Sequence, residues 1–235
     1  MALAAVMSGL VSLAAACGDG PPPGAAPAVD EVLIQPGSIP DSERVIVVAL
    51  GDSLTAGLGL PSEEAYPARL QYMFAEEGYP EVEVVNAGVS GETTAGGLRR
   101  AESVLEPGVR IVIVALGGND ALRGLSVAQT RENLAGIIET YLAAGVDVLL
   151  AGMQAPTNLG MDYQQGFRGV YQALAAGYRD RIRFVPFLLE GVAGRAALNQ
   201  ADGIHPNADG ARLIAELLYP TVRDMVDDLP PAPEQ

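Results

Sequence analysis

A serine, a histidine and an aspartate in this chain have the types and spacing needed for nucleophilic acyl transfer. Ser53 lies in Gly51-Asp52-Ser53-Leu54, directly after an apolar run, and His205 is the only histidine. A serine hydroxyl becomes a useful nucleophile when an imidazole accepts its proton, and a carboxylate on the other ring nitrogen stabilises the imidazolium. Asp202 stands three residues before His205, and Gly203 between them permits a tight turn. The sequence therefore predicts Ser53 as nucleophile, His205 as base and Asp202 as the partner of His205.

Two glycine-containing loops carry hydrogen-bond donors of the kind that acyl transfer needs. Attack on a carbonyl creates an oxyanion, and donors aimed at that oxygen lower the barrier. The backbone amide of Gly91 can approach a substrate closely, and the side-chain amide of Asn119 donates without titrating. The amide of Ser53, at the start of a predicted helical turn, is a third donor. Taken singly, each feature has a structural explanation, because Asp and Ser cap helices and Gly and Asn favour turns.

The composition excludes several classes of chemistry. All 14 basic residues are arginine, so mechanisms that require a Schiff-base lysine or a P-loop lysine are ruled out. A formal net charge of -15 repels nucleic-acid phosphates, and we expect no nucleic-acid partner. One cysteine and one histidine cannot build a disulfide framework or a Cys/His metal site, and no EF-hand spacing occurs. The sequence therefore predicts chemistry that needs neither a cofactor nor a metal.

Strand-like and helix-like segments alternate from residue 44 onward. Apolar, β-branched runs typical of buried parallel strands occur at 45–50, 82–86, 110–116, 146–151 and 183–187. Helical periodicity between and after them predicts helices at 61–78, 93–105, 126–144, 163–179 and 206–228. This alternation predicts one domain at 44–228 with a doubly wound parallel sheet, followed by a disordered tail at 229–235. Chemistry should gather in the loops beyond the carboxyl ends of the strands, where Ser53, Gly91 and Asn119 fall.

The N-terminal region indicates export and attachment to a membrane. Residues 1–16 are uncharged and apolar and end in small residues, as in a signal peptide, although no basic residue precedes the apolar run. The segment from Leu13 to Cys17 resembles a bacterial lipobox whose leucine stands one place further from the cysteine than usual. Residues 17–43 are rich in proline and glycine, which suits an extended tether. We therefore expect a lipoprotein anchored through Cys17 and facing the periplasm or the cell exterior. An ordinary signal peptide that leaves a free thiol is the alternative.

Four blocks of this sequence resemble, in order, the conserved blocks of the SGNH (GDSL-type) hydrolases. They are Gly51-Asp52-Ser53-Leu54, Gly91, Gly118-Asn119-Asp120 and Asp202-x-x-His205, within a resemblance that covers about residues 45–218. The residues in and around these blocks are most similar to the bacterial arylesterase and thioesterase I/lysophospholipase branch. The resemblance implies a flavodoxin-like three-layer sandwich with a five-stranded parallel sheet. It also implies a triad and an oxyanion hole, the triad being Ser53, Asp202 and His205 and the oxyanion donors Ser53, Gly91 and Asn119. Thr55 replaces the glycine that an α/β-hydrolase nucleophile elbow would need.

These features together predict a serine esterase that acts through an acyl-enzyme. Its expected substrates are carboxylic esters with aryl or short to medium acyl groups, and thioesters or lysophospholipids also fit. The loops at 153–161 and 122–125 contain apolar side chains that suit an acyl or aryl group. Two other interpretations stay open from the residues. One is a deacetylase that acts on carbohydrate of the cell envelope, and the other is a catalytically silent surface module that binds glycan or lipid.

Overall fold

The computed structural model describes residues 44–230, in which five strands form one parallel sheet. The strand order is β2-β1-β3-β4-β5, the flavodoxin-like order, with every neighbouring pair parallel. The predicted strands are therefore confirmed, with ends that differ by one or two residues. Their bounds are Val45–Gly51 (β1), Val82–Gly88 (β2), Val109–Ala115 (β3), Asp147–Ala151 (β4) and Ile182–Val185 (β5).

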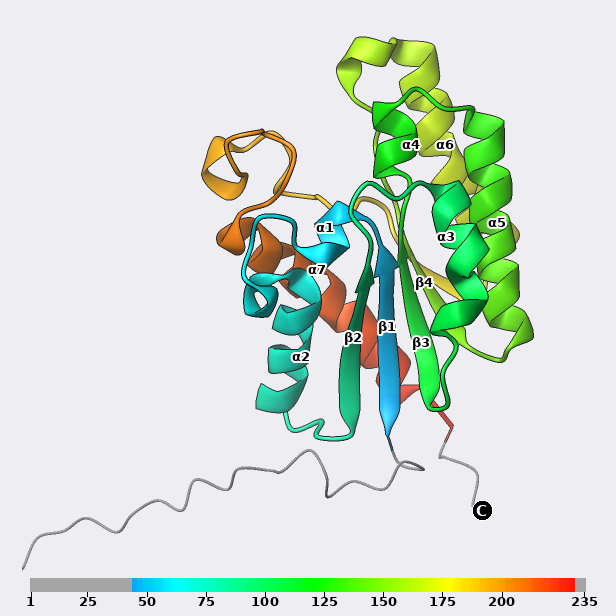
Figure 1. Cartoon of the computed structure of the whole chain (residues 1–235). Helices are drawn as coiled ribbons and strands as arrows, with labels where there is room; N and C mark the ends of the chain where they lie inside the picture. The colour runs from blue at the N-terminus through cyan, green and yellow to red at the C-terminus, as the bar shows by residue number, and fades with distance from the viewer. Residues whose placement is uncertain (1–43, 231–235) are drawn as a thin grey trace, which may run out of the picture. The chain divides into compact units, whose positions relative to one another are not determined.

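Helices cover both faces of the sheet and make the predicted three layers (Figure 1). On one face lie α2 (Tyr66–Glu76) and α7 (Ala208–Asp227), which pack against each other. The other face carries α3 (Thr94–Arg100), α5 (Val127–Ala143) and α6 (Met161–Gly177). Two short helices follow strand ends directly, α1 (Ser53–Ala56) after β1 and α4 (Gly118–Leu122) after β3. Single 3₁₀ turns occupy Ser62–Glu64, Ala101–Val104, Thr157–Leu159 and Ala196–Leu198.

The core forms around the central strands because their side chains are apolar on both faces. Val47, Leu50, Ile111, Ile113 and Leu149 are completely removed from solvent. Burial of a side chain of this size contributes about 1.5 to 3 kcal/mol, so these strands supply a large share of the hydrophobic stabilisation. The carboxyl ends of β1 and β3 leave this rigid centre and lead straight into α1 and α4. Loops anchored in this way can hold polar groups in fixed positions.

The helix predicted at 61–78 is divided in two. Residues 62–64 form a 3₁₀ turn, Ala65 is extended with ψ 146, and α2 begins at Tyr66. A continuous helix from residue 61 would need an amide hydrogen at residue 67, and Pro67 has none. Proline is instead well placed in the first turn of α2.

The two residues after the predicted domain boundary at 228 also contact the folded part of the chain. Leu229 packs against the hydrophobic core, and the carbonyl of Pro230 accepts a hydrogen bond of 3.1 Å from Arg110 Nη2. Within residues 44–230, none of the helices has the length and apolar character that crossing a bilayer would take.

The outer edge of β2 is covered by side-chain amides. Gln71, on α2, donates from Nε2 to the carbonyl of Val82 at 3.0 Å and accepts from the amide of Val84 at 2.7 Å. Further along the strand, the Asn86 side chain accepts from the amide of Gly88 at 2.9 Å. Gln71 thus pairs with the strand edge as a neighbouring strand would, through one donor and one acceptor.

Candidate active site

The turn after β1 presents Ser53 as the first residue of α1. Asp52 caps this helix, because its Oδ1 accepts from the amide of Leu54 at 3.0 Å. The cap explanation for this motif therefore applies to Asp52 and leaves the Ser53 hydroxyl available. The turn is tight, since a Cβ on Gly51 would lie 2.6 Å from Cβ of Thr55 and 2.9 Å from the carbonyl oxygen of Ala115. Only glycine fits at this strand end.

His205 is held in a short closed loop before α7. An antiparallel bridge joins Asn199 to Pro206, and the amide of Gln200 donates to the carbonyl of His205 at 2.7 Å. Gly203 turns the chain with φ 68, a left-handed conformation that favours glycine. This turn brings Oδ1 of Asp202 to the amide of His205 at 3.0 Å. The loop geometry therefore orients Asp202 before its second oxygen meets the imidazole.

Ser53, His205 and Asp202 form a continuous hydrogen-bonded chain. Ser53 Oγ lies 2.9 Å from His205 Nε2, although 152 residues separate them in sequence. On the other side of the ring, His205 Nδ1 lies 2.6 Å from Oδ2 of Asp202. The hydrogen bond from the His205 ring, with backbone amides of His205 and Ile204, holds the pKa of Asp202 well below its usual range. The carboxylate is thus ionised at neutral pH and can stabilise the imidazolium that forms when His205 accepts the serine proton.

Gln200 joins the serine loop to the histidine loop. Its Nε2 donates to the carbonyl of Leu58 at 2.7 Å and to the carbonyl of Pro206 at 2.9 Å. Leu58 follows α1, so a single side chain links the segment after Ser53 with the residue after His205. Sequence reasoning missed Gln200, because a glutamine between two loops carries no signal of its own.

The two backbone amides predicted as oxyanion donors are available. Gly91 has φ 80, and its carbonyl accepts from Arg123 Nη2 at 2.8 Å. In the part of the chain that the structure describes, neither the amide of Gly91 nor that of Ser53 donates to a protein acceptor. Both can therefore serve a bound molecule.

Asn119, the third predicted donor, is engaged. Its Nδ2 donates to Oδ2 of Asp52 at 3.2 Å and to the carbonyl of Glu92 at 3.0 Å, which uses both hydrogens of the amide. To donate to a substrate, Asn119 has to exchange one of these bonds. The bond to Asp52 is the longer, and it is therefore the one that a substrate oxygen can replace at lower cost.

Two buried carboxylates stand beside these groups. Asp52 is 1% exposed, and burial raises its pKa from 3.8 to about 6 against the opposing effect of the Leu54 amide and the Asn119 side chain. Asp120 is 2% exposed and accepts from the amide of Thr94 at 2.8 Å and from its hydroxyl at 2.6 Å. Asp120 thus ties the Asn119 loop to the start of α3. The sequence signal for Asp52 is an acidic residue directly after a buried strand, whereas Asp120 lies within α4 and has no such signal.

The match to known proteins agrees with this arrangement. The model of the GDSL-like lipase/acylhydrolase family matches residues 49–213. The chain belongs to this family. Esterase TesA of Pseudomonas aeruginosa is 42% identical over 181 residues, which are 77% of this chain and 89% of that protein. Thioesterase 1/protease 1/lysophospholipase L1 of Escherichia coli is 35% identical over 182 residues, 77% of this chain and 85% of that protein.

Solved structures extend the likeness of this SGNH hydrolase to three dimensions. The crystal structure of TesA has a TM-score of 0.72 at 42% identity and covers 77% of this chain and 99% of its own. The structure of AlinE4, an SGNH-hydrolase family esterase, has a TM-score of 0.64 at 45% identity, with 80% and 97% covered. The predicted family and fold are therefore confirmed, and the chain is a serine esterase of the SGNH type.

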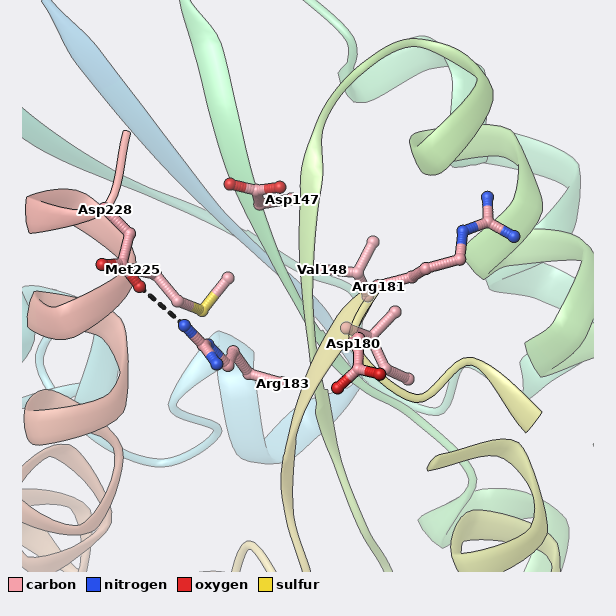
Figure 2. A pocket seen from close by; sticks show the side chains of 8 residues that line it. Asp147, Val148, Asp180, Arg181, Arg183, Met225 and Asp228 are labelled. Atoms are coloured by element: carbon pink, nitrogen blue, oxygen red, sulfur yellow. Dashed lines mark hydrogen bonds and ion pairs between the residues drawn. The ribbon is translucent and has the colours of Figure 1, made fainter. Parts of the chain in front are cut away.

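A separate hollow of this SGNH hydrolase lies at the amino ends of β4 and β5, opposite the strand ends that carry Ser53 and Asn119 (Figure 2). It is lined by carboxylates and arginines, among which Arg183 Nη2 and Oδ2 of Asp228 pair at 2.6 Å. None of the motif residues lines it. Nor does any group of three or more Cys, His, Asp or Glu side chains between residues 44 and 230 form a metal site.

Proposed function

We propose that this esterase hydrolyses carboxylic esters through an acyl-enzyme formed on Ser53. The observation that carries the proposal is the hydrogen-bonded chain from Ser53 Oγ through the His205 ring to the carboxylate of Asp202. His205 Nε2 accepts the serine proton as Oγ attacks the carbonyl carbon, and then gives that proton to the leaving oxygen. Water activated by the same nitrogen hydrolyses the acyl-enzyme. Ionised Asp202 stabilises the imidazolium in both steps.

The tetrahedral oxyanion is bound in this proposal by the amides of Ser53 and Gly91 and by Asn119. The loss of one such donor typically costs about 3 to 4 kcal/mol of transition-state stabilisation. Asn119 joins when its Nδ2 leaves Asp52 for the developing charge. This exchange favours the transition state over the ester, because a neutral carbonyl competes less well than an oxyanion for a hydrogen bond already made to a carboxyl group.

The substrate proposed for this site has an apolar acyl or aryl group. Leu122, Leu125 and Met161 are 50%, 39% and 75% exposed. Leu122 ends α4, Leu125 follows that helix, and Met161 begins α6. Exposed apolar side chains that follow the proposed oxyanion donor Asn119 in the chain suit a hydrocarbon group. The names of the relatives include esterase, thioesterase, lysophospholipase and arylesterase, which supports aryl and acyl esters as well as thioesters and lysophospholipids.

The proposed location is the outer side of a membrane, with the chain exported and anchored through lipid on Cys17. The support is the sequence alone, because the signal peptide at 1–16 and the tether at 17–43 lie outside the described residues. Replacement of Cys17 by serine should release the enzyme into the soluble fraction of cells, since a lipid chain supplies the membrane affinity. Continued membrane association of the variant would contradict the anchor.

The test of the proposed function is ester hydrolysis by Ser53→Ala. We expect the variant to fold and to lose at least about 10³-fold in kcat on p-nitrophenyl acetate and butyrate, because nothing replaces the nucleophile. Ser62→Ala is the matched control, since Ser62 is exposed and its hydroxyl, within residues 44–230, bonds only to the neighbouring Glu63. Full activity of Ser53→Ala would overturn the proposal. A series of longer esters then measures the acyl preference.

A further inference from the structure

Arg100, the last residue of α3, joins three segments that meet at the active site. Its Nε donates to both carboxylate oxygens of Glu92, at 2.9 and 2.8 Å, and its Nη2 donates to the same carboxylate. Nη2 also donates to the carbonyl of Ala87 at 2.8 Å and to the carbonyl of Gly51 at 3.2 Å. The side chains of Arg100 and Glu92 are only 21% and 9% exposed, so this pair is shielded from solvent.

Each partner of Arg100 belongs to a segment that carries a proposed active-site group. Gly51 ends β1 two residues before Ser53, and Ala87 lies at the end of β2, before the Gly91 loop. Glu92 follows Gly91, and its own carbonyl accepts the hydrogen bond from Asn119. One guanidinium therefore touches the chain on both sides of the Gly91 loop and at the start of the serine turn.

The chemistry of these contacts requires arginine. The carbonyls of Gly51 and Ala87 stand where the sheet ends, and several N–H groups in one plane can serve them together with a carboxylate. The α3 backbone makes room for the arrangement, because a Cβ on Gly96 would lie 2.7 Å from Cγ of Glu92. The side chain of Glu92 therefore packs against Gly96, one helical turn before Arg100. From there its carboxylate contacts the guanidinium of Arg100.

We propose that Arg100 is a positioning residue, which holds the Gly91 loop at the distance from the β1 turn that lets the oxyanion donors and Ser53 act on one carbonyl. This inference rests on the proposed function. Arg100 makes no contact with His205 or Asp202, so it acts on the donors and leaves the base alone. A displacement of donors by about 1 Å is enough to lower a rate by a factor on the order of 10².

The test is Arg100→Met, assayed on p-nitrophenyl butyrate with active sites counted by a fluorophosphonate taken to complete reaction. Counting corrects for any misfolded fraction. We expect kcat for each titrated site to fall on the order of 10²-fold, with KM changed less than about threefold. The acid limb of the pH profile should stay in place. Arg100→Lys should recover part of the loss, because it keeps the charge without the planar fork.

Arg99→Met is the matched control, since Arg99 is exposed and donates only to the carbonyl of Ala95 within its own helix. It should keep kcat within about twofold. Should Arg100→Met fail to fold, Gly96→Ala displaces Glu92 while keeping both charges, and kcat for each titrated site should fall by about tenfold. If the folded variant keeps the wild-type kcat for each titrated site, so that any lost activity reflects fewer active molecules, the positioning role is overturned. Full esterase activity of Ser53→Ala would instead overturn the proposed function.

Discussion

Asp52 offers a quantitative test of how burial shapes this site. Its pKa is raised from 3.8 to about 6 by desolvation. One pKa unit is equivalent to about 1.4 kcal/mol, so the two-unit difference represents about 3 kcal/mol. Because the folded pKa lies above the unfolded one, the native state binds more protons between about pH 4 and pH 6. The contribution of Asp52 to the unfolding free energy is therefore fully present below about pH 4 and is lost as the pH rises through about 6.

The perturbation is Asp52→Asn, which has the same shape and does not titrate. The variant loses the acceptor for Asn119, and this lowers its unfolding free energy by the same amount at every pH. That constant cost cancels when the change in unfolding free energy between pH 4 and pH 7.5 is compared in the two proteins. Wild type should lose about 2.4 kcal/mol more than the variant over this interval, because the unfolded carboxyl is already partly ionised at pH 4. The measurement is urea unfolding of both proteins at both pH values, followed by fluorescence of tyrosine or by circular dichroism.

Asp162→Asn is the control, because Asp162 is exposed at the start of α6. Its replacement should leave the difference between the two pH values as in wild type. A difference between wild type and Asp52→Asn below about 1 kcal/mol would refute the reasoning. It would mean that the amide of Leu54 and the side chain of Asn119 together compensate the carboxylate for its burial.

Three further predictions follow from the site geometry. Asp202→Asn should lower kcat/KM, because an amide stabilises the imidazolium less well than a carboxylate and no longer fixes the ring tautomer; an unchanged kcat/KM would exclude Asp202 as the partner of His205. Gly203→Ala should destabilise the fold by about 1 kcal/mol through its φ of 68 alone, since an added Cβ meets no atom within 4 Å; thermal unfolding measures this, and an unchanged Tm would show that the turn relaxes. Arg123→Ala should lower kcat by no more than about fivefold, because its bond to the Gly91 carbonyl is exposed to solvent; a loss near 10²-fold would mean that Arg123 has a larger part in placing the Gly91 loop.

The strands and the approach of Ser53 to His205 were predictable because strong, local signals specify them. Continuous β-branched runs such as 45–50 and 110–116 belong to buried parallel strands, and parallel strands bring the loops at their carboxyl ends together. Asp202, Gly203 and His205 lie within four residues, so their spacing alone indicated the turn. The start of the helix expected at 61–78 was wrong, because helical periodicity extends to the N-terminal side of Pro67 while the missing amide of this proline prevents a continuous helix.

The contacts of Asn119 and Arg100 were not predictable from the same signals. Asn119 was expected to present a free donor. Its side-chain amide instead donates to Asp52 and to the carbonyl of Glu92, which belong to the segments after two other strands. In the sequence, Arg100 is one of two adjacent basic residues within the helix expected at 93–105. In the folded protein Arg99 is exposed to solvent, whereas Arg100 contacts Ala87 and Glu92 on the two sides of the Gly91 loop. Side-chain pairing between distant segments depends on three-dimensional register, which residue types do not encode singly.

The pairing of Gln71 with β2 bears on how this enzyme behaves when many copies are crowded together. A bare edge strand recruits edge strands of other molecules and starts ordered aggregates. Here the amides of Val84 and Gly88 on this edge are already occupied by side chains of the same molecule. Self-association through β2 would first have to break those bonds, which places a local barrier before any strand-to-strand growth. A leucine at position 71 would remove that barrier at Val84 and leave the catalytic end of the sheet untouched.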